Sequence, residues 1–137
     1  MRKFKIENKY NCDLNVSGIY VLWLAGGYFY IGMAKNISRR INQHTVSINK
    51  ILDTGEVLSH YKLIDLLKKD SRIKKAIVQP LIICHESKLR QFEDWLLVYN
   101  LFNKKSLNNH SCHYEKRKEI APFRYHYIKT YNHNFRY

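Results

Sequence analysis

The sequence predicts a single α+β domain, and three observations lead to this prediction. Residues 17–44 contain two short apolar strands that meet at a pair of glycines and continue into a basic helix. A further apolar run at residues 81–84 lies between two segments with helical periodicity. The length of 137 residues fits one domain, and a hydrophobic content of 45% is sufficient for a buried core.

The first two strands form a hairpin, and the length of its loop decides which side chains share a face. Both strands are rich in β-branched and aromatic residues. A two-residue loop would place Tyr20 and Tyr30 on opposite faces, because side chains alternate along a strand. A three-residue loop at residues 25–27 would instead pair Leu22 with Tyr30, so that both phenols share a face. Gly27 permits the positive φ that such a loop needs, and we therefore expect this loop or a bulge.

A helix follows the hairpin and ends near residues 49–52, before a turn at residues 53–55. Asn36 is the expected N-cap. Arg40 and His44 are four residues apart and therefore lie on one helical face. The apolar pattern consists of Ile37, Ile41, Val46 and Ile48.

The remaining elements follow in order. Residues 1–16 form a basic lead-in that we expect to add an edge to the sheet, and a second helix is predicted at residues 60–69. Pro80 precedes the third strand, a position typical of a strand start or an edge strand. Ser87 is the expected cap of a third helix that runs to about residue 102. Its buried stripe is predicted to contain Leu89, Phe92, Leu96 and Tyr99.

The formal net charge of +13 indicates a polyanionic partner, and nucleic acid is the favoured one. No long apolar run or amphipathic anchor indicates a membrane protein. Three cysteines and the absence of a secretory leader favour a reduced, cytoplasmic setting. The segment 110–113 holds His, Cys and His, but it lacks the second ligand pair of a zinc finger.

Residues 110–137 differ from the preceding core, residues 1–109, because they alternate basic and aromatic side chains. Basic groups contact phosphates and aromatic rings stack on bases, so this extension is predicted to bind nucleic acid. The alternative is that its aromatic side chains pack on the core. The predicted nucleic-acid contacts are Lys35, Arg39, Lys116, Arg117, Lys118 and Arg124.

Residues 17–108 resemble the GIY-YIG nuclease family. The resemblance is carried by Gly-Ile-Tyr at residues 18–20 and Tyr-Ile-Gly at residues 30–32, followed by Ala34-Lys35. Arg40, ten residues after the second motif begins, and His44, one helical turn later, complete the pattern. The resemblance implies a small three-stranded antiparallel sheet flanked by helices, and a DNA endonuclease activity.

The resemblance also implies two further site residues near the end of the core. Glu93 matches an acidic residue on the last core helix, and Asn108, after an apolar residue, matches an asparagine in the following loop. Asn109 is a register alternative to Asn108. Glu86 is a poorer acidic candidate because it precedes the helix, and His60 is a weaker histidine candidate.

Each of these residues has an expected role in phosphodiester hydrolysis. Tyr20 is the candidate general base, although its ordinary pKa near 10 requires neighbours or a metal to lower it. Tyr30 would position the water, and Arg40 would clamp the transition state, because guanidinium binds phosphate oxygens in a bidentate manner. His44 would relay a proton or hold a phosphate, and Asn108 would orient the phosphate or its loop. Alternatively, both phenols are structural and a metal-bound hydroxide attacks.

Glu93 is the expected ligand of a single Mg²⁺, for which Mn²⁺ can substitute. Magnesium often takes only one or two protein carboxylates, so one glutamate is sufficient. The eleven acidic residues include no closely spaced pair of the two-metal kind.

The predicted protein is therefore a Mg²⁺-dependent DNA endonuclease with a phage, mobile-element, restriction or repair role. One active site would nick one strand, so a double-strand break would require a homodimer or two events. The alternatives are a binding module that keeps the fold without catalysis, and a nuclease that acts on RNA.

Overall fold

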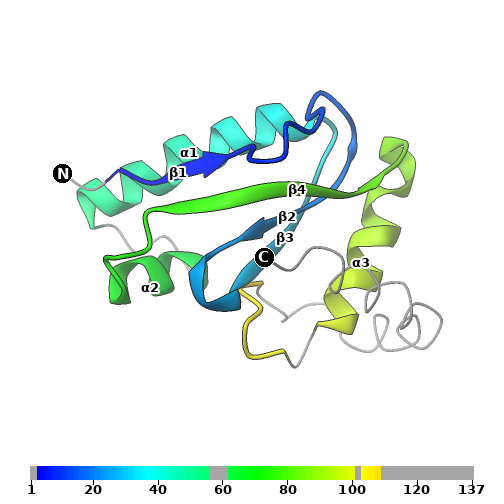
Figure 1. The fold of residues 1–137 in the computed structure, drawn as a ribbon. Coiled ribbons are helices and arrows are strands. Elements are labelled where there is room, and N and C mark those ends of the chain that lie inside the picture. The colour runs from blue at the N-terminus through cyan, green and yellow to red at the C-terminus, as the bar shows by residue number, and fades with distance from the viewer. Residues whose placement is uncertain (1–2, 56–61, 101–102, 109–137) are drawn as a thin grey trace.

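The computed structural model describes residues 3–55, 62–100 and 103–108 (Figure 1). In this part of the chain, four strands form one sheet in the order β1-β4-β2-β3. Figure 1 shows α1 and α3 well apart, with strands between them. The elements are β1 (Lys5–Glu7), β2 (Gly18–Trp23), β3 (Phe29–Ala34), α1 (Ile37–Thr54), α2 (Lys62–Lys69), β4 (Lys75–Ile83) and α3 (Leu89–Tyr99), with short 3₁₀ turns η1 (Ala25–Gly27) and η2 (Glu86–Lys88).

The α+β class is confirmed, but the sheet has four strands and is mixed, where three antiparallel strands were expected. β2 is antiparallel to both β3 and β4, as expected, whereas β1 adds a fourth strand parallel to β4. The lead-in is held to the helix layer by Asn49 of α1. Its amide accepts a hydrogen bond from the Phe4 backbone N–H at 2.7 Å and donates one to the Phe4 carbonyl at 2.9 Å.

The hairpin has the three-residue loop that the sequence favours. Leu22 lies opposite Tyr30, and the Leu24 N–H donates to the Tyr28 carbonyl at 2.9 Å. Gly26 and Gly27 have φ of +84° and +81°, so the loop needs both glycines, where only the second was expected to matter.

The third predicted strand was placed too late in the chain. β4 begins at Lys75, and Pro80 lies inside it rather than at its start. The sheet tolerates the proline for two reasons. First, β1 pairs only with residues 75–77, so within the described residues Pro80 has a neighbouring strand on one side only, which is β2. Second, the register of β2 against β4 shifts between Ile19 and Tyr20, opposite the proline.

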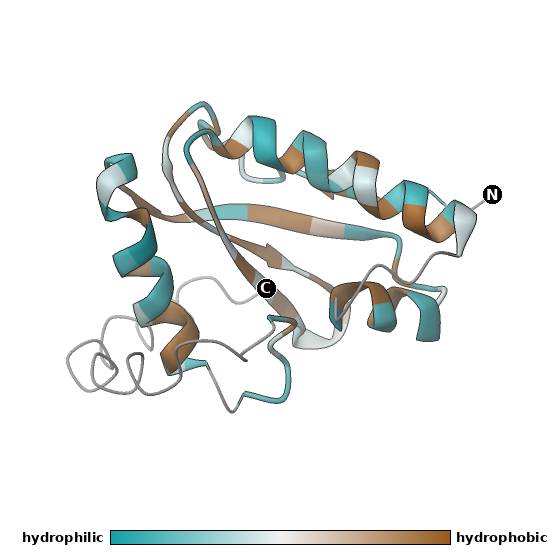
Figure 2. Ribbon diagram, turned by 180° about the vertical axis from the view of Figure 1, so that it is seen from behind, coloured by the Kyte–Doolittle hydropathy of each residue, from teal (hydrophilic) through white to brown (hydrophobic). Residues whose placement is uncertain are grey.

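The sheet separates two hydrophobic clusters, because alternate residues of β2 project to opposite faces. Tyr20 and Leu22 pack on the face that α1 and α2 cover, whereas Ile19 and Val21 pack on the face that α3 covers. Figure 2 shows hydrophobic and hydrophilic residues alternating along α1. The expected apolar pattern of this helix is wrong at Val46, which is 70% exposed. Its buried residues are Ile37, Ile41, His44, Ile48 and Ile51.

The ends of the helices agree only partly with the sequence. Asn36 caps α1 by accepting a hydrogen bond from the Arg39 N–H at 3.0 Å, as predicted. The helix ends later than expected, at Thr54, where Gly55 adopts a φ of +70°. Ser87 does not cap α3; its N–H donates to His85 within the preceding turn.

Residues 103–108 cover the outer edge of β3. The Phe29 N–H donates to the Lys105 carbonyl at 3.0 Å, and the Leu107 N–H donates to the Phe29 carbonyl at 2.8 Å. This pairing protects an edge strand that would otherwise present unpaired backbone groups. None of the helices in the described ranges has the length and apolar character needed to cross a membrane.

Candidate active site

Two of the predicted site residues, Tyr20 and His44, form a direct hydrogen bond between β2 and α1. The Tyr20 hydroxyl lies 2.8 Å from Nε2 of His44. The Tyr30 ring also meets His44, with ring centroids 5.7 Å apart in an edge-to-face arrangement. The three-residue loop makes this possible, because it places both phenols on the face toward α1.

Gly32 provides the space for the Tyr20 phenol. The two residues lie opposite each other in the β2–β3 pairing. A Cβ atom added to Gly32 would overlap the hydroxyl end of the Tyr20 ring. The glycine of the second tripeptide therefore accommodates the tyrosine of the first, which gives a physical reason for the two motifs to occur together.

His44 occupies a position that an apolar residue would normally fill. It is 5% exposed and lies in register with Ile37, Ile41, Ile48 and Ile51. Burial, together with the charge of nearby Arg40, lowers the pKa of His44 to about 4. The imidazole is therefore neutral at pH 7, and in the tautomer with the proton on Nδ1 its Nε2 accepts the hydrogen bond that the Tyr20 hydroxyl donates. The burial of His44 could have been inferred from the sequence, because the histidine has helical spacing with the isoleucines of this stripe.

The expectation of a lowered pKa for Tyr20 is wrong for the protein as it stands. Burial raises the pKa of this phenol well above 10, and Tyr30 and Glu93 raise it further. Arg40 acts in the opposite direction, through its charge and a side-chain hydrogen bond to the phenol. Desolvation exceeds the effect of the guanidinium, so the proton stays on Tyr20 at neutral pH.

The charges of Arg40 and Glu93 act on the same phenol from different elements. Arg40 lies on the exposed side of α1, where its Nη1 also donates to Gln43 at 3.4 Å. Glu93 is a half-buried residue of α3, a helix that packs mainly on β3 and β2. Both side chains influence the charge state of Tyr20, so the site joins groups from a strand and two helices.

Asn108 holds the loop after α3 to the sheet. Its Oδ1 accepts from the Ile31 N–H at 2.9 Å, and its Nδ2 donates to the Ile31 carbonyl at 2.6 Å. The side chain is buried and bonded to the residue beside Tyr30. Of its two expected roles, this geometry corresponds to orientation of the loop.

Of the remaining candidate residues, the structure describes two predicted nucleic-acid contacts. Lys35, which follows β3, and Arg39, in the first turn of α1, are both exposed. Six further candidates lie outside the described residues, together with the extension and the 110–113 segment. These six are His60, Asn109, Lys116, Arg117, Lys118 and Arg124.

Glu93 has the donor chemistry that Mg²⁺ prefers. Its carboxylate supplies hard oxygen ligands, and magnesium retains several waters beside one protein carboxylate. Within the described ranges, no group of three or more His, Cys, Asp or Glu side chains could hold a metal ion. A site at Glu93 would therefore be of the sparse, water-rich type.

No family model, curated protein or solved structure matches this chain.

Proposed function

We propose that this protein is a Mg²⁺-dependent endonuclease that hydrolyses phosphodiester bonds in DNA and nicks one strand per active site. The observation that carries the proposal is the hydrogen bond between the buried Tyr20 and His44, with Arg40 and Glu93 acting on the same phenol. Two titratable groups whose pKa values are both strongly shifted, side by side under a basic helix, are typical of a functional site.

The side chains divide the work of hydrolysis between them. Arg40 binds the non-bridging oxygens of the phosphate and stabilises the charge that develops on them in the transition state. Tyr20 is fully buried in the free protein, so substrate binding must admit a water to its hydroxyl. The Tyr20 oxygen then accepts the proton of this attacking water while the phenolic proton passes to Nε2 of His44. The negative phosphate favours the resulting imidazolium and so offsets the low basicity of His44.

The other residues hold this arrangement in place. Glu93 would hold Mg²⁺, which supplies charge neutralisation for the phosphate and the leaving oxygen when bound. Tyr30 positions the water beside Tyr20, and Asn108 fixes the β3 backbone that carries Tyr30. Lys35 and Arg39 contact flanking phosphates and so add sequence-independent affinity.

A plasmid-nicking assay tests the proposal. We expect supercoiled DNA to be converted to the open-circular form with Mg²⁺ or Mn²⁺, and not with EDTA. Arg40→Gln should slow nicking by about 10²–10³-fold, the typical cost of losing a transition-state donor. Glu93→Gln should abolish nicking at ordinary Mg²⁺ concentration.

Two variants provide matched controls. Arg90→Gln removes the same charge from an exposed position on α3, and Glu86→Gln removes an exposed carboxylate that precedes this helix. Both should nick at the rate of the unmodified protein. Equal losses in Arg40→Gln and Arg90→Gln would show that only the overall charge matters, and would contradict the assigned role.

A catalytically inactive nucleic-acid-binding module is the second candidate, and the raised pKa of Tyr20 is the observation that favours it. A phenol that keeps its proton is a poor base, and the +13 charge alone supports binding. Binding of DNA without cleavage, unaffected by Mg²⁺, would establish the module. Structured RNA in parallel reactions separates a DNA nuclease from one that acts on RNA.

A further inference from the structure

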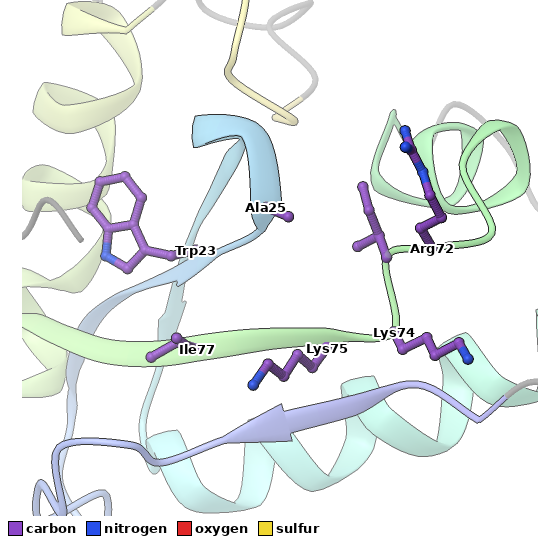
Figure 3. A pocket seen from close by; sticks show the side chains of 7 residues that line it. Trp23, Ala25, Arg72, Lys74, Lys75 and Ile77 are labelled. Carbon is purple, nitrogen blue, oxygen red and sulfur yellow. The ribbon is translucent and has the colours of Figure 1, made fainter.

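An open pocket lies on the face of the sheet opposite to Tyr20, and the proposed reaction does not use it. Its volume is about 400 Å³, within the range of small-molecule sites. β2 and the chain around the start of β4 line it, as Figure 3 shows. Its apolar side chains include Trp23, Ala25 and Ile77, and its basic ones are Arg72, Lys74 and Lys75.

Trp23 offers an apolar ring surface rather than a hydrogen-bonding group. Its Nε1 already donates to Oε1 of Gln79 at 3.1 Å, and its ring contacts Phe29 on β3 with centroids 5.8 Å apart. The half-buried indole is therefore anchored on one side, and its remaining surface lines the pocket together with Ile77. A fixed aromatic surface of this kind suits stacking against a planar ring.

The basic side of the pocket belongs to a strongly cationic segment, residues 68–75, which ends at the first residue of β4. Residues 68–75 contain five cations and one carboxylate, so the local net charge is +4. Two cations are engaged in pairs: Arg72 binds the half-buried Asp70 in a bidentate manner at 3.0 and 3.1 Å, and Lys75 lies 3.5 Å from the partly exposed Glu7. A pair such as Lys75–Glu7 contributes only about 0–1 kcal/mol, so an incoming phosphate can displace Glu7. A phosphate at Arg72 would use Nη1, which the bidentate pair with Asp70 does not use. In Figure 3 the Lys75 side chain extends along β4 toward Ile77, whereas Lys74 points the other way.

We propose that this pocket binds single-stranded DNA, with one unpaired base stacked on Trp23 and the adjoining phosphates held by Arg72 and Lys75. A base in a duplex is stacked between its neighbours and presents no free face, so the ligand must be unpaired at this point. An acidic peptide would satisfy the cations but would bring no planar ring to the indole surface that lines the pocket. Only the choice of DNA as the polymer rests on the proposed function.

Tryptophan fluorescence can test the pocket once Trp23 is the only tryptophan in the chain. The chain has two tryptophans, and Trp95→Phe leaves Trp23 as the only one. An oligothymidylate of roughly ten nucleotides, a typical site size, is titrated in EDTA so that no cleavage occurs. We expect the Trp23 fluorescence to be quenched in a saturable manner, because a stacked base is in contact with the ring.

Three substitutions in the Trp95→Phe background sharpen the test. Lys75→Gln and Arg72→Gln should each weaken binding and reduce the salt slope of the affinity by about 0.7, the value for one phosphate contact with a single strand. Glu7→Gln should act in the opposite direction, tightening binding a few-fold because it releases Lys75. Circular dichroism verifies that each variant is folded.

Three results would overturn the proposal that this pocket binds single-stranded DNA. These are unchanged Trp23 fluorescence throughout the titration, equal quenching by a DNA duplex of the same length, and equal quenching by polyglutamate, which would indicate a protein partner. The two proposals fail separately. Quenching without any plasmid nicking overturns only the nuclease, whereas nicking without quenching overturns only the pocket.

Discussion

The two faces of β2 use their aromatic side chains in contrasting ways. On one face, the Tyr20 ring is fully buried, its hydroxyl is hydrogen-bonded to His44, and the charge of Arg40 acts on it. On the other face, Trp23 is only half-buried, donates a hydrogen bond to Gln79, and borders an open pocket. The strand and its hydrogen-bonding neighbours are the same, so the difference comes from what covers each face.

Burial therefore decides which face is sensitive to charge. α1 lies over Tyr20 and removes water from it, so the charge states of Tyr20 and His44 are strongly perturbed. Around Trp23 the cationic side chains are exposed, and water screens a pair such as Lys75 with Glu7. Changes on the covered face should accordingly cost more than changes on the open face.

The largest expected effect is acid destabilisation through His44. Its pKa is about 4 in the folded protein and 6.5 when unperturbed, so the unfolded chain binds the proton more tightly. Stability is therefore constant above pH 6.5 and falls as the pH decreases toward 4, by about 3 kcal/mol in total. Urea unfolding across this pH range measures the effect. His44→Gln should flatten the slope, and an unaltered slope in that variant would assign it to other groups.

Gly32→Ala should have the next largest effect. The new methyl group overlaps the Tyr20 phenol, and relief of this overlap must separate the phenol from His44. Overpacking of this kind costs about 1–3 kcal/mol, and nicking should be lost together with the hydrogen bond. Gly27→Ala is the control, because nothing lies near its added methyl group and only its positive φ is strained. That variant should lose stability and retain nicking.

Two asparagine tethers allow a comparison of intermediate size. Asn108 and Asn49 each bind both backbone groups of one residue, Ile31 and Phe4 respectively. Asn108→Ala leaves two buried backbone groups unpaired and should cost about 2 kcal/mol, whereas Asn49→Ala acts at a partly buried position and should cost about 1 kcal/mol. Thermal unfolding measures both. Nicking should fall only in Asn108→Ala, and equal loss in both variants would remove the special role of the site loop.

The parts of the fold that depend on local sequence could be predicted. The loop length followed from the position of Gly27, and the start of α1 followed from Asn36. These features depend on backbone geometry within a few residues. The pairing of β1 with β4 joins residues about seventy positions apart, and no local pattern specifies such a partner.

The proximity of the site side chains could be predicted from the sequence better than their charge states could. The structure brings Tyr20, Tyr30, Arg40, His44 and Glu93 into one electrostatic environment. The direction of the Tyr20 pKa shift could not be foreseen, because it depends on how completely α1 excludes water from the phenol. The pocket at Trp23 was also missed, since it requires the long-range pairing of β2 with β4.

The smallest expected effect is that of Trp23→Phe, which tests the open face directly. The substitution keeps one aromatic ring but removes the other ring of the indole together with the N–H that donates to Gln79, so stability should fall by about 1 kcal/mol. The acid destabilisation should remain as in the unmodified protein, because Trp23 faces away from His44. In Tyr20→Phe, by contrast, Nε2 of His44 loses its hydrogen bond to the Tyr20 hydroxyl. The pH at which stability declines should therefore shift. Parallel shifts in both variants would show that the two faces are coupled through β2, and the contrast between them would no longer hold.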